Sequence, residues 1–247
     1  VSLVLGSGGA RGLAHIGVIR VLEERGFRIT SIAGCSVGAL VGGVYAAGKL
    51  KEYEDWVRNL TKFDMVNLMD IAWVGGGLVK GQKIINKMIK LVGDRRIEEL
   101  PIPFTAVATE LESGREVWLS EGPLFDAIRS SCSLPLFFTP TKYKEKMLVD
   151  GGVVNPVPIA PVFHDNTDLT IAVNLGGRPR KDQVVERKKD VGAYEVAYFV
   201  FDFKISFDLE VRDWLLLYFF AAIGLRADIR TLISGGRPLA ILLLLAT

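Results

Sequence analysis

A serine between two glycines is the residue pattern in this chain with the clearest chemical meaning. The order Gly34-Cys35-Ser36-Val37-Gly38 follows an apolar, strand-like run and precedes a run of small residues suited to a helix. A sharp turn from strand to helix needs small residues on both sides, and it presents the serine hydroxyl at the exposed end of the strand. The pattern therefore predicts that Ser36 is a nucleophile. The alternative is a glycine-rich turn that contains a serine incidentally.

A glycine-rich loop, residues 6–12 (GSGGARG), follows the first expected strand and opens the first expected helix. A serine that transfers acyl groups needs donors for the developing oxyanion, and backbone N–H groups in such a loop can converge on a negative charge. The alternative is a phosphate-binding loop. However, the chain lacks the G-K-[ST] ending, and Arg11 stands where G-x-G-x-x-G requires its last glycine. We therefore favour an oxyanion-binding loop over a nucleotide site.

The proton acceptor for Ser36 is sought first among the histidines, of which the chain has two. His15 falls in the first expected helix and is interpreted as a packing or capping residue, and His164 lies in a polar loop and is interpreted as solvated. Asp150 ends an apolar strand and is followed by two glycines, so its carboxylate is expected at a sheet end with space around it. Without Ser36, the same residues would be taken as an ordinary Asp-Gly turn. We predict Asp150 as the base.

The elements that must position these residues alternate between strand and helix. Residues 2–5 and 29–33 are predicted strands, and residues 13–25 and 38–47 are predicted helices, a βαβα order that favours an α/β fold with a parallel sheet. Further along the chain, the patterns predict helices over 52–60, 82–92 and 123–131, and strands over 104–108, 116–119, 147–149 and 169–174. The aromatic, glycine-rich stretch 64–77 is interpreted as a flap over a site.

Together these motifs resemble the patatin-like phospholipase family, from residue 1 to about residue 177. The matching residues are Gly8-Gly9-x-Arg11-Gly12, Gly34-x-Ser36-x-Gly38 and Asp150-Gly151-Gly152, with the segments 129–135 and 155–158 also similar. The resemblance implies a three-layer α/β/α fold with a mainly parallel central sheet, and a serine–aspartate dyad without a catalytic histidine. It further implies that Ser36 attacks a lipid ester carbonyl and that Asp150 accepts its proton. Gly8, Gly9 and Arg11 would hold the oxyanion.

The function that the resemblance implies is that of a serine lipid acyl hydrolase of the phospholipase, lysophospholipase or esterase type, needing no cofactor or metal. Its partners would be a lipid or lysophospholipid ester and a membrane surface, and its oligomeric state stays open. The formal net charge of +2 implies no nucleic-acid partner, and the two cysteines are interpreted as buried thiols of a reducing compartment. We therefore expect a bacterial, cytoplasmic, membrane-associated enzyme. The alternative is a catalytically idle regulatory or scaffold protein that retains the fold.

The composition changes toward the C-terminus, where a charged run over 178–190 is followed by apolar runs over 214–225 and 239–246. Residues from about 205 to 247 resemble an internal fragment of bacterial sodium/glutamate symporters, so a membrane-transport protein is a third alternative. Because a bilayer-spanning helix needs about 20 apolar residues, the first run is short. We predict an acyl hydrolase domain over 1–190, a junction over 191–205 and a truncated hydrophobic helical appendage over 206–247. The chain is expected to be a piece of a longer sequence, joined by a natural fusion, a frameshift or an assembly error.

Overall fold

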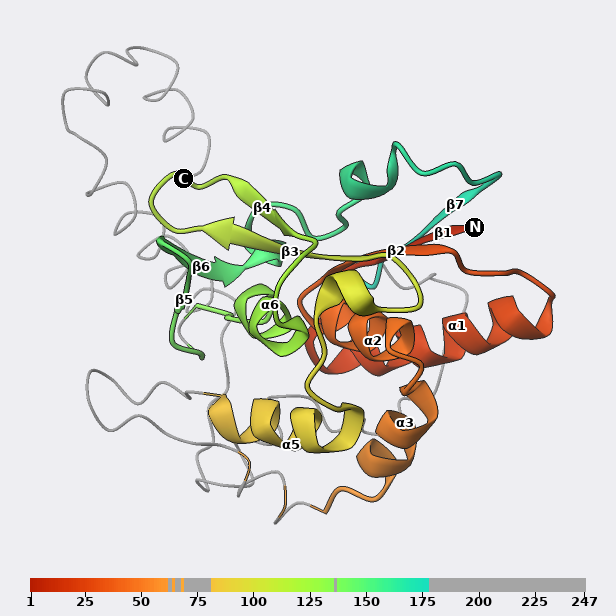
Figure 1. Ribbon diagram of the computed structural model, residues 1–247, viewed down its shortest axis with the longest axis horizontal. Helices are drawn as coiled ribbons and strands as arrows, with labels where there is room; N and C mark the ends of the chain where they lie inside the picture. Colours follow the sequence, from red (N-terminus) through yellow and green to blue (C-terminus); the bar gives the residue numbers. More distant parts are fainter. Residues whose placement is uncertain (62–63, 65–67, 69–80, 136, 178–247) are drawn as a thin grey trace. The chain divides into compact units, whose positions relative to one another are not determined.

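The computed structural model describes residues 1–61, 64, 68, 81–135 and 137–177 (Figure 1). The predicted flap over 64–77 lies outside the described residues except for 64 and 68, and the predicted junction and appendage lie outside them entirely. Within the described ranges, no helix combines the length and the apolar character that a bilayer crossing requires.

Seven strands in the described part of the chain form one mixed sheet. Four of them run parallel in the order β3-β2-β1-β7, and β4, β5 and β6 join by antiparallel pairing. The strands are β1 (Ser2–Leu5), β2 (Ser31–Cys35), β3 (Phe104–Glu110), β4 (Glu116–Leu119), β5 (Thr141–Tyr143), β6 (Lys146–Asp150) and β7 (Thr170–Val173). The predicted α/β fold is therefore confirmed, with a parallel centre and an antiparallel side.

Strand β3 brings the ends of β2 and β6 together. Its residues 104–107 pair with β2, and its residues 108–110 pair with β6. Strand β4 pairs with residues 106–109 of β3, a range that includes residues paired with β2 and residues paired with β6. Strand β4 therefore occupies one edge of β3, while β2 and β6 share the other edge. Because β2 runs parallel to β3 and β6 runs antiparallel to it, the two strands meet end to end. Their last residues, Cys35 and Asp150, lie opposite Val107 and Ala108, which are consecutive in β3.

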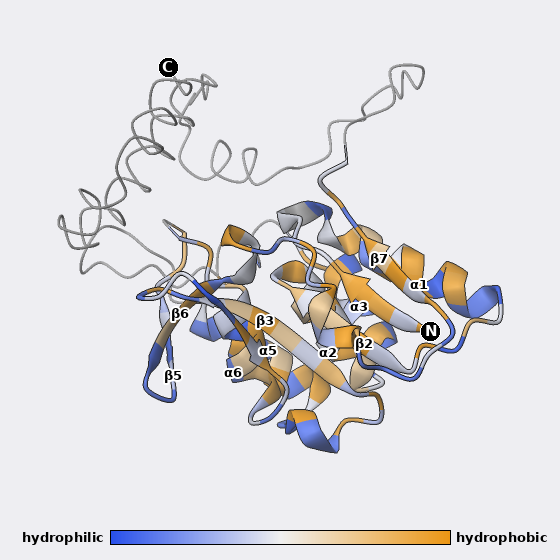
Figure 2. Ribbon diagram, turned by 90° about the horizontal axis from the view of Figure 1, so that it is seen from above, coloured by the Kyte–Doolittle hydropathy of each residue, from blue (hydrophilic) through white to orange (hydrophobic). Residues whose placement is uncertain are grey.

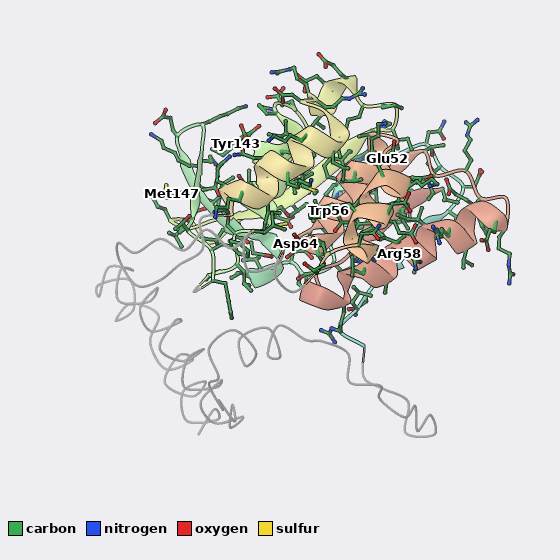
Figure 3. The ribbon with its side chains drawn as sticks, turned by 90° about the horizontal axis from the view of Figure 1, so that it is seen from below. Glu52, Trp56, Arg58, Asp64, Tyr143 and Met147 are labelled. Atoms are coloured by element: carbon green, nitrogen blue, oxygen red, sulfur yellow. The ribbon has the colours of Figure 1, made fainter. Side chains whose placement is uncertain are left out.

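The long helices pack on one side of this sheet, as Figures 1 and 2 show together. They are α1 (Ala14–Glu24), α2 (Val37–Ala46), α3 (Leu50–Arg58), α5 (Gln82–Val92) and α6 (Leu124–Ser131). Each contributes to one apolar core with the strands, for example through Ile19, Val41, Tyr53, Met88 and Ile128. Seen from below in Figure 3, Trp56 and Arg58 mark α3, at a distance from Tyr143 and Met147 of the β5–β6 hairpin.

The opposite face of the sheet has a smaller cover in the described residues. There Val4 and Ala33 pack against Val162 of the short 3-10 helix η4 (Ala160–Val162). The second helical layer of the expected three-layer fold is not among the described residues. The described part is thus a sheet with helices on one face and an irregular segment on the other.

Candidate active site

Ser36 occupies the turn between β2 and α2, in a conformation that is rare for a residue with a side chain. Its φ of 57° and ψ of −127° lie in the left-handed half of conformational space. A Cβ atom at Gly34 would come within 2.6 Å of the Gly38 carbonyl oxygen, and one at Gly38 would overlap the Leu5 carbonyl oxygen. Both glycines therefore allow the close approach that this turn requires.

The hydroxyl of Ser36 donates a hydrogen bond to Asp150, with 2.5 Å between Oγ and Oδ2. The other carboxylate oxygen, Oδ1, accepts the backbone N–H of Gly152 at 2.7 Å. Asp150 is only 2% exposed, whereas Ser36 is half-buried. The two residues meet because β2 and β6 end at consecutive positions of β3.

Burial raises the pKa of Asp150 above its ordinary value, because the charged carboxylate is removed from water. The hydrogen bonds from Ser36 and from the Gly152 N–H stabilise the charged form and lower the pKa, but burial has the larger effect. A raised pKa makes this carboxylate a better proton acceptor than an exposed one.

The two histidines lie away from this pair. His15 on α1 is fully buried, and its Nε2 lies 2.8 Å from the Gly6 carbonyl oxygen. Since a carbonyl only accepts, this contact assigns the ring proton to Nε2. Burial lowers the pKa of His15, with the bond to Gly6 acting in the opposite direction. His164 is exposed, and in the described part of the chain neither ring bonds to Ser36 or Asp150. The interpretation of His15 as a packing residue agrees with these contacts.

The glycine loop leaves the backbone donors of Gly8 and Gly9 available. The 3-10 helix η1 (Gly9–Leu13) begins inside the loop, and the Arg11 N–H donates to the Gly8 carbonyl oxygen at 3.2 Å. The N–H groups of Gly8 and Gly9 have no acceptor among the residues that the structure describes. Gly9 has a φ of +55°, in the region that favours glycine. The Arg11 N–H is therefore already engaged within the loop, and its side chain is exposed.

The remaining motif glycines lie where the three motifs touch each other. A Cβ atom at Gly12 would overlap the side chain of Val37, so the glycine loop packs directly against the serine turn. A Cβ atom at Gly152 would come within 2.8 Å of Ser7 Oγ, so the segment after Asp150 packs directly against the glycine loop. At Gly151 it would overlap the backbone of β3. Three motifs that are far apart in the sequence therefore form one site.

Ser131, at the end of α6, and Ser133, just after it, are parts of this site to which the sequence assigned no function. The Ser131 hydroxyl accepts the Ser36 N–H at 2.9 Å, and the Ser133 carbonyl oxygen accepts the Asp150 N–H at 2.9 Å. Sequence reasoning noted segment 129–135 as similar to the family without giving it a role. The available signal was a cluster of small polar residues directly after an apolar helix.

A cavity of about 570 Å³ lies at the other end of β2. Arg28, Ile29 and Thr30, which precede β2, line it, whereas Ser36 follows β2. Its lining residues include no serine, cysteine or histidine. The cavity is thus separate from the Ser36–Asp150 pair and is not a candidate active site.

Comparison with known proteins identifies the family. The family model described as patatin-like phospholipase matches residues 3–163, which is more than half of the chain and contains all three motifs. The chain belongs to the patatin-like phospholipase family. A second model, for the sodium/glutamate symporter, matches residues 193–247 of this patatin-like chain.

Several relatives share the patatin-like region. An uncharacterized NTE family protein of Mycobacterium tuberculosis (strain ATCC 25618 / H37Rv) is 49% identical over 177 residues, covering 72% of this chain and 49% of the relative. Lysophospholipase NTE1 of Kluyveromyces lactis is 33% identical over 184 residues, covering 71% of this chain and 12% of the relative. The chain thus spans about half the length of the mycobacterial relative and a small part of the fungal one. The crystal structure of VipD from Legionella pneumophila is similar with a TM-score of 0.49 and 17% identity, covering 62% of this chain and 46% of that chain.

Proposed function

We propose that this chain is a serine acyl hydrolase that cleaves lipid esters, with lysophospholipids as its substrate class. Ser36 is the nucleophile and Asp150 is the base. The observation that carries the proposal is the 2.5 Å hydrogen bond between the Ser36 hydroxyl and a carboxylate that is 2% exposed. Membership of the patatin-like phospholipase family supports the reaction class, and the fungal relatives named lysophospholipase support the substrate class.

Acylation begins when Ser36 Oγ attacks the carbonyl carbon of the ester. The hydroxyl proton passes to Asp150 Oδ2, and the carbonyl π electrons move onto oxygen to form the oxyanion. The open N–H groups of Gly8 and Gly9 donate to this oxygen, and the Arg11 guanidinium adds positive charge nearby. When the intermediate collapses, the C–O bond to the alcohol breaks. The leaving alkoxide takes the proton from Asp150, and an acyl group remains on Ser36.

Deacylation repeats these steps with water as the nucleophile. Water gives its proton to Asp150 while its oxygen attacks the acyl carbon. Ser36 Oγ then leaves and recovers the proton from Asp150, which releases the fatty acid. Asp150 therefore alternates between base and acid, and its raised pKa suits both roles better than that of an exposed carboxylate. The reaction needs an ionised Asp150 at its start, so the rate should rise with pH through this pKa.

The replacement Ser36→Ala tests the proposal with p-nitrophenyl butyrate and a lysophospholipid as substrates. We expect hydrolysis to fall by about three orders of magnitude or more, because a nucleophile is lost. Circular dichroism should stay close to wild type, because only a hydroxyl at a half-buried turn is removed, and the melting temperature should fall modestly at neutral pH because the buried Asp150 carboxylate loses one hydrogen bond. Turnover within a few-fold of wild type would refute the assignment of Ser36. A catalytically idle scaffold would fail to react with a fluorophosphonate probe even in its wild-type form.

We also propose that the enzyme works in the cytoplasm at a membrane surface, where substrates of this class are found. Fractionation of cells that express the full chain, followed by activity measurements on each fraction, tests this location.

A further inference from the structure

We propose that Ser131, in the last turn of α6, is a positioning residue that holds Ser36 in its reactive conformation. This inference rests on the function proposed above. The Ser131 hydroxyl accepts the backbone N–H of Ser36 at 2.9 Å and donates its own proton to the Val107 carbonyl oxygen at 2.6 Å. One fully buried hydroxyl thus connects the serine turn to strand β3.

The register of the sheet explains why this hydroxyl is needed. The β2–β3 ladder begins with the Ile32 N–H donating to the Pro103 carbonyl oxygen, and rungs of a parallel ladder repeat every two residues. The rung two steps later would join the Ser36 N–H directly to the Val107 carbonyl oxygen. Ser131 Oγ binds both of these groups instead. It therefore takes the place of a rung of the ladder, and Ser36 can turn away from β3.

The residues directly after α6 also contact the acid. The Ser133 carbonyl oxygen accepts the Asp150 N–H at 2.9 Å, two residues after Ser131. The Ser133 side chain is held in turn by the Arg129 guanidinium at 2.6 Å and lies 2.8 Å from Thr141 Oγ1. The C-terminal end of α6 and the two residues after it thus bind the backbone of both Ser36 and Asp150.

Loss of the Ser131 hydroxyl would have a defined consequence. The Ser36 N–H and the Val107 carbonyl oxygen would lose their shared partner, and the shortest way to restore a hydrogen bond is to pair with each other. That pairing would draw the serine turn toward β3, away from the conformation with φ of 57°. The Ser36 hydroxyl would then leave its 2.5 Å contact with Asp150. The effect should appear in the chemical step, because the substrate-binding surface is unchanged.

The test compares Ser131→Ala with Ser130→Ala in the full chain, with p-nitrophenyl butyrate as substrate. Ser130 is a matched control because it is also fully buried on α6, and among the described residues its hydroxyl donates within the helix alone, to the Asp126 carbonyl oxygen at 2.8 Å. For Ser131→Ala we expect kcat to fall about 10- to 100-fold with little change in KM, the size of loss typical of a misplaced reacting group. Ser130→Ala should stay within about twofold of wild type in kcat.

Two further variants test the role of Ser131 even if Ser131→Ala fails to fold. Ser131→Cys, with a sulfur that accepts hydrogen bonds weakly, should reproduce the loss in kcat. Ser131→Thr keeps the hydroxyl and should restore most of the rate. All rates are divided by the folded fraction from the amplitude of the thermal melt. The pH at which activity is half lost on acidification should rise in Ser131→Ala and stay unchanged in Ser130→Ala, because the hydrogen bond from Ser36 that lowers the pKa of Asp150 is lost only in the first variant.

The outcomes separate this inference from the proposed function. If Ser36→Ala abolishes activity while Ser131→Ala and Ser130→Ala show the same rate per folded molecule, the role of Ser131 is refuted and the proposed function stands. If Ser36→Ala retains activity, the proposed function itself fails. A Ser131→Thr variant that folds but stays as slow as Ser131→Ala would also refute the positioning role.

Discussion

Asp150 combines two properties that oppose each other at the level of a single residue. Its proposed role requires a negative charge, and its burial disfavours that charge. The Ser36 hydroxyl and the Gly152 N–H offset part of this cost, yet the pKa stays raised. A buried, incompletely compensated charge is typical of residues kept for activity at some expense of stability.

Replacing Asp150 by Asn should therefore separate activity from stability. We expect hydrolysis to fall by about three orders of magnitude, because the amide cannot accept the proton. The fold should be at least as stable at neutral pH, since the Asn oxygen can accept the Gly152 N–H and its NH₂ group can face Ser36. Aryl ester hydrolysis and thermal melts of the two proteins measure both effects.

The pH dependence of this stability difference follows from the sign of the pKa shift. A raised pKa in the folded state means that the contribution of Asp150 to the free energy of unfolding is fully present below its ordinary pKa of 3.8. That contribution is lost as the pH rises through the folded-state value. The advantage of Asp150→Asn should therefore grow from acid to neutral pH. An advantage that grew on acidification instead would contradict this account, and exposed His164→Ala serves as the control.

At the level of elements, local patterns predicted much of the fold. The helix predicted over 82–92 is found as α5 (Gln82–Val92), because Ile85, Met88 and Val92 fall on one buried face and Gly93 ends the helix. The strand predicted over 29–33 is found as β2 (Ser31–Cys35). Its bounds depend on where β3 can pair with it, and this long-range register is not encoded in hydropathy. Strand β5 (Thr141–Tyr143) was missed because it is short and has no buried residue.

The candidate site shows the same division between local and long-range information. Ser36, Asp150 and the glycines could be predicted because each lies in a local strand-end or loop pattern. Ser131 could not be assigned a role, because its proposed role depends on a bond to an N–H group that is 95 residues away in the sequence. The same holds for the sharing of one edge of β3 by β2 and β6. Only the fold brings these groups together.

The serine turn itself provides a test at the level of elements. A methyl group at Gly38 would overlap the backbone of Leu5, which cannot move without disturbing β1. We expect Gly38→Ala to lower the free energy of unfolding by about 3 kcal/mol and to reduce the rate per folded molecule.

The control for this test is Gly17→Ala on α1, where a Cβ atom meets open space. It should raise the free energy of unfolding by about 0.5–1 kcal/mol, because alanine is favoured over glycine within a helix. Urea unfolding curves measure both variants. Equal stabilities for the two variants would show that the close approach at Gly38 is not important.

At the level of the whole molecule, the patatin-like region should be separable from the C-terminal residues. The family match covers residues 3–163, and the described strands and helices form their core within residues 1–177. A chain of residues 1–190 should therefore melt cooperatively and hydrolyse aryl esters at the rate of the full chain. It should also be more soluble, because the apolar runs over 214–225 and 239–246 are removed. Loss of the cooperative melt in this shortened chain would show that the removed residues 191–247 are needed for the fold, and that the predicted domain boundary is wrong.

The end-to-end placement of β2 and β6 on β3 has a consequence for how proteins with this fold can diversify. Ser36 and Asp150 are 114 residues apart in the sequence, yet their spacing depends on two adjacent positions of one strand. The chain between them can gain or exchange segments, for example after α3 or between β3 and β4, without altering that spacing. New preferences for head groups or acyl chains can therefore arise in the connecting segments while the chemistry is inherited unchanged.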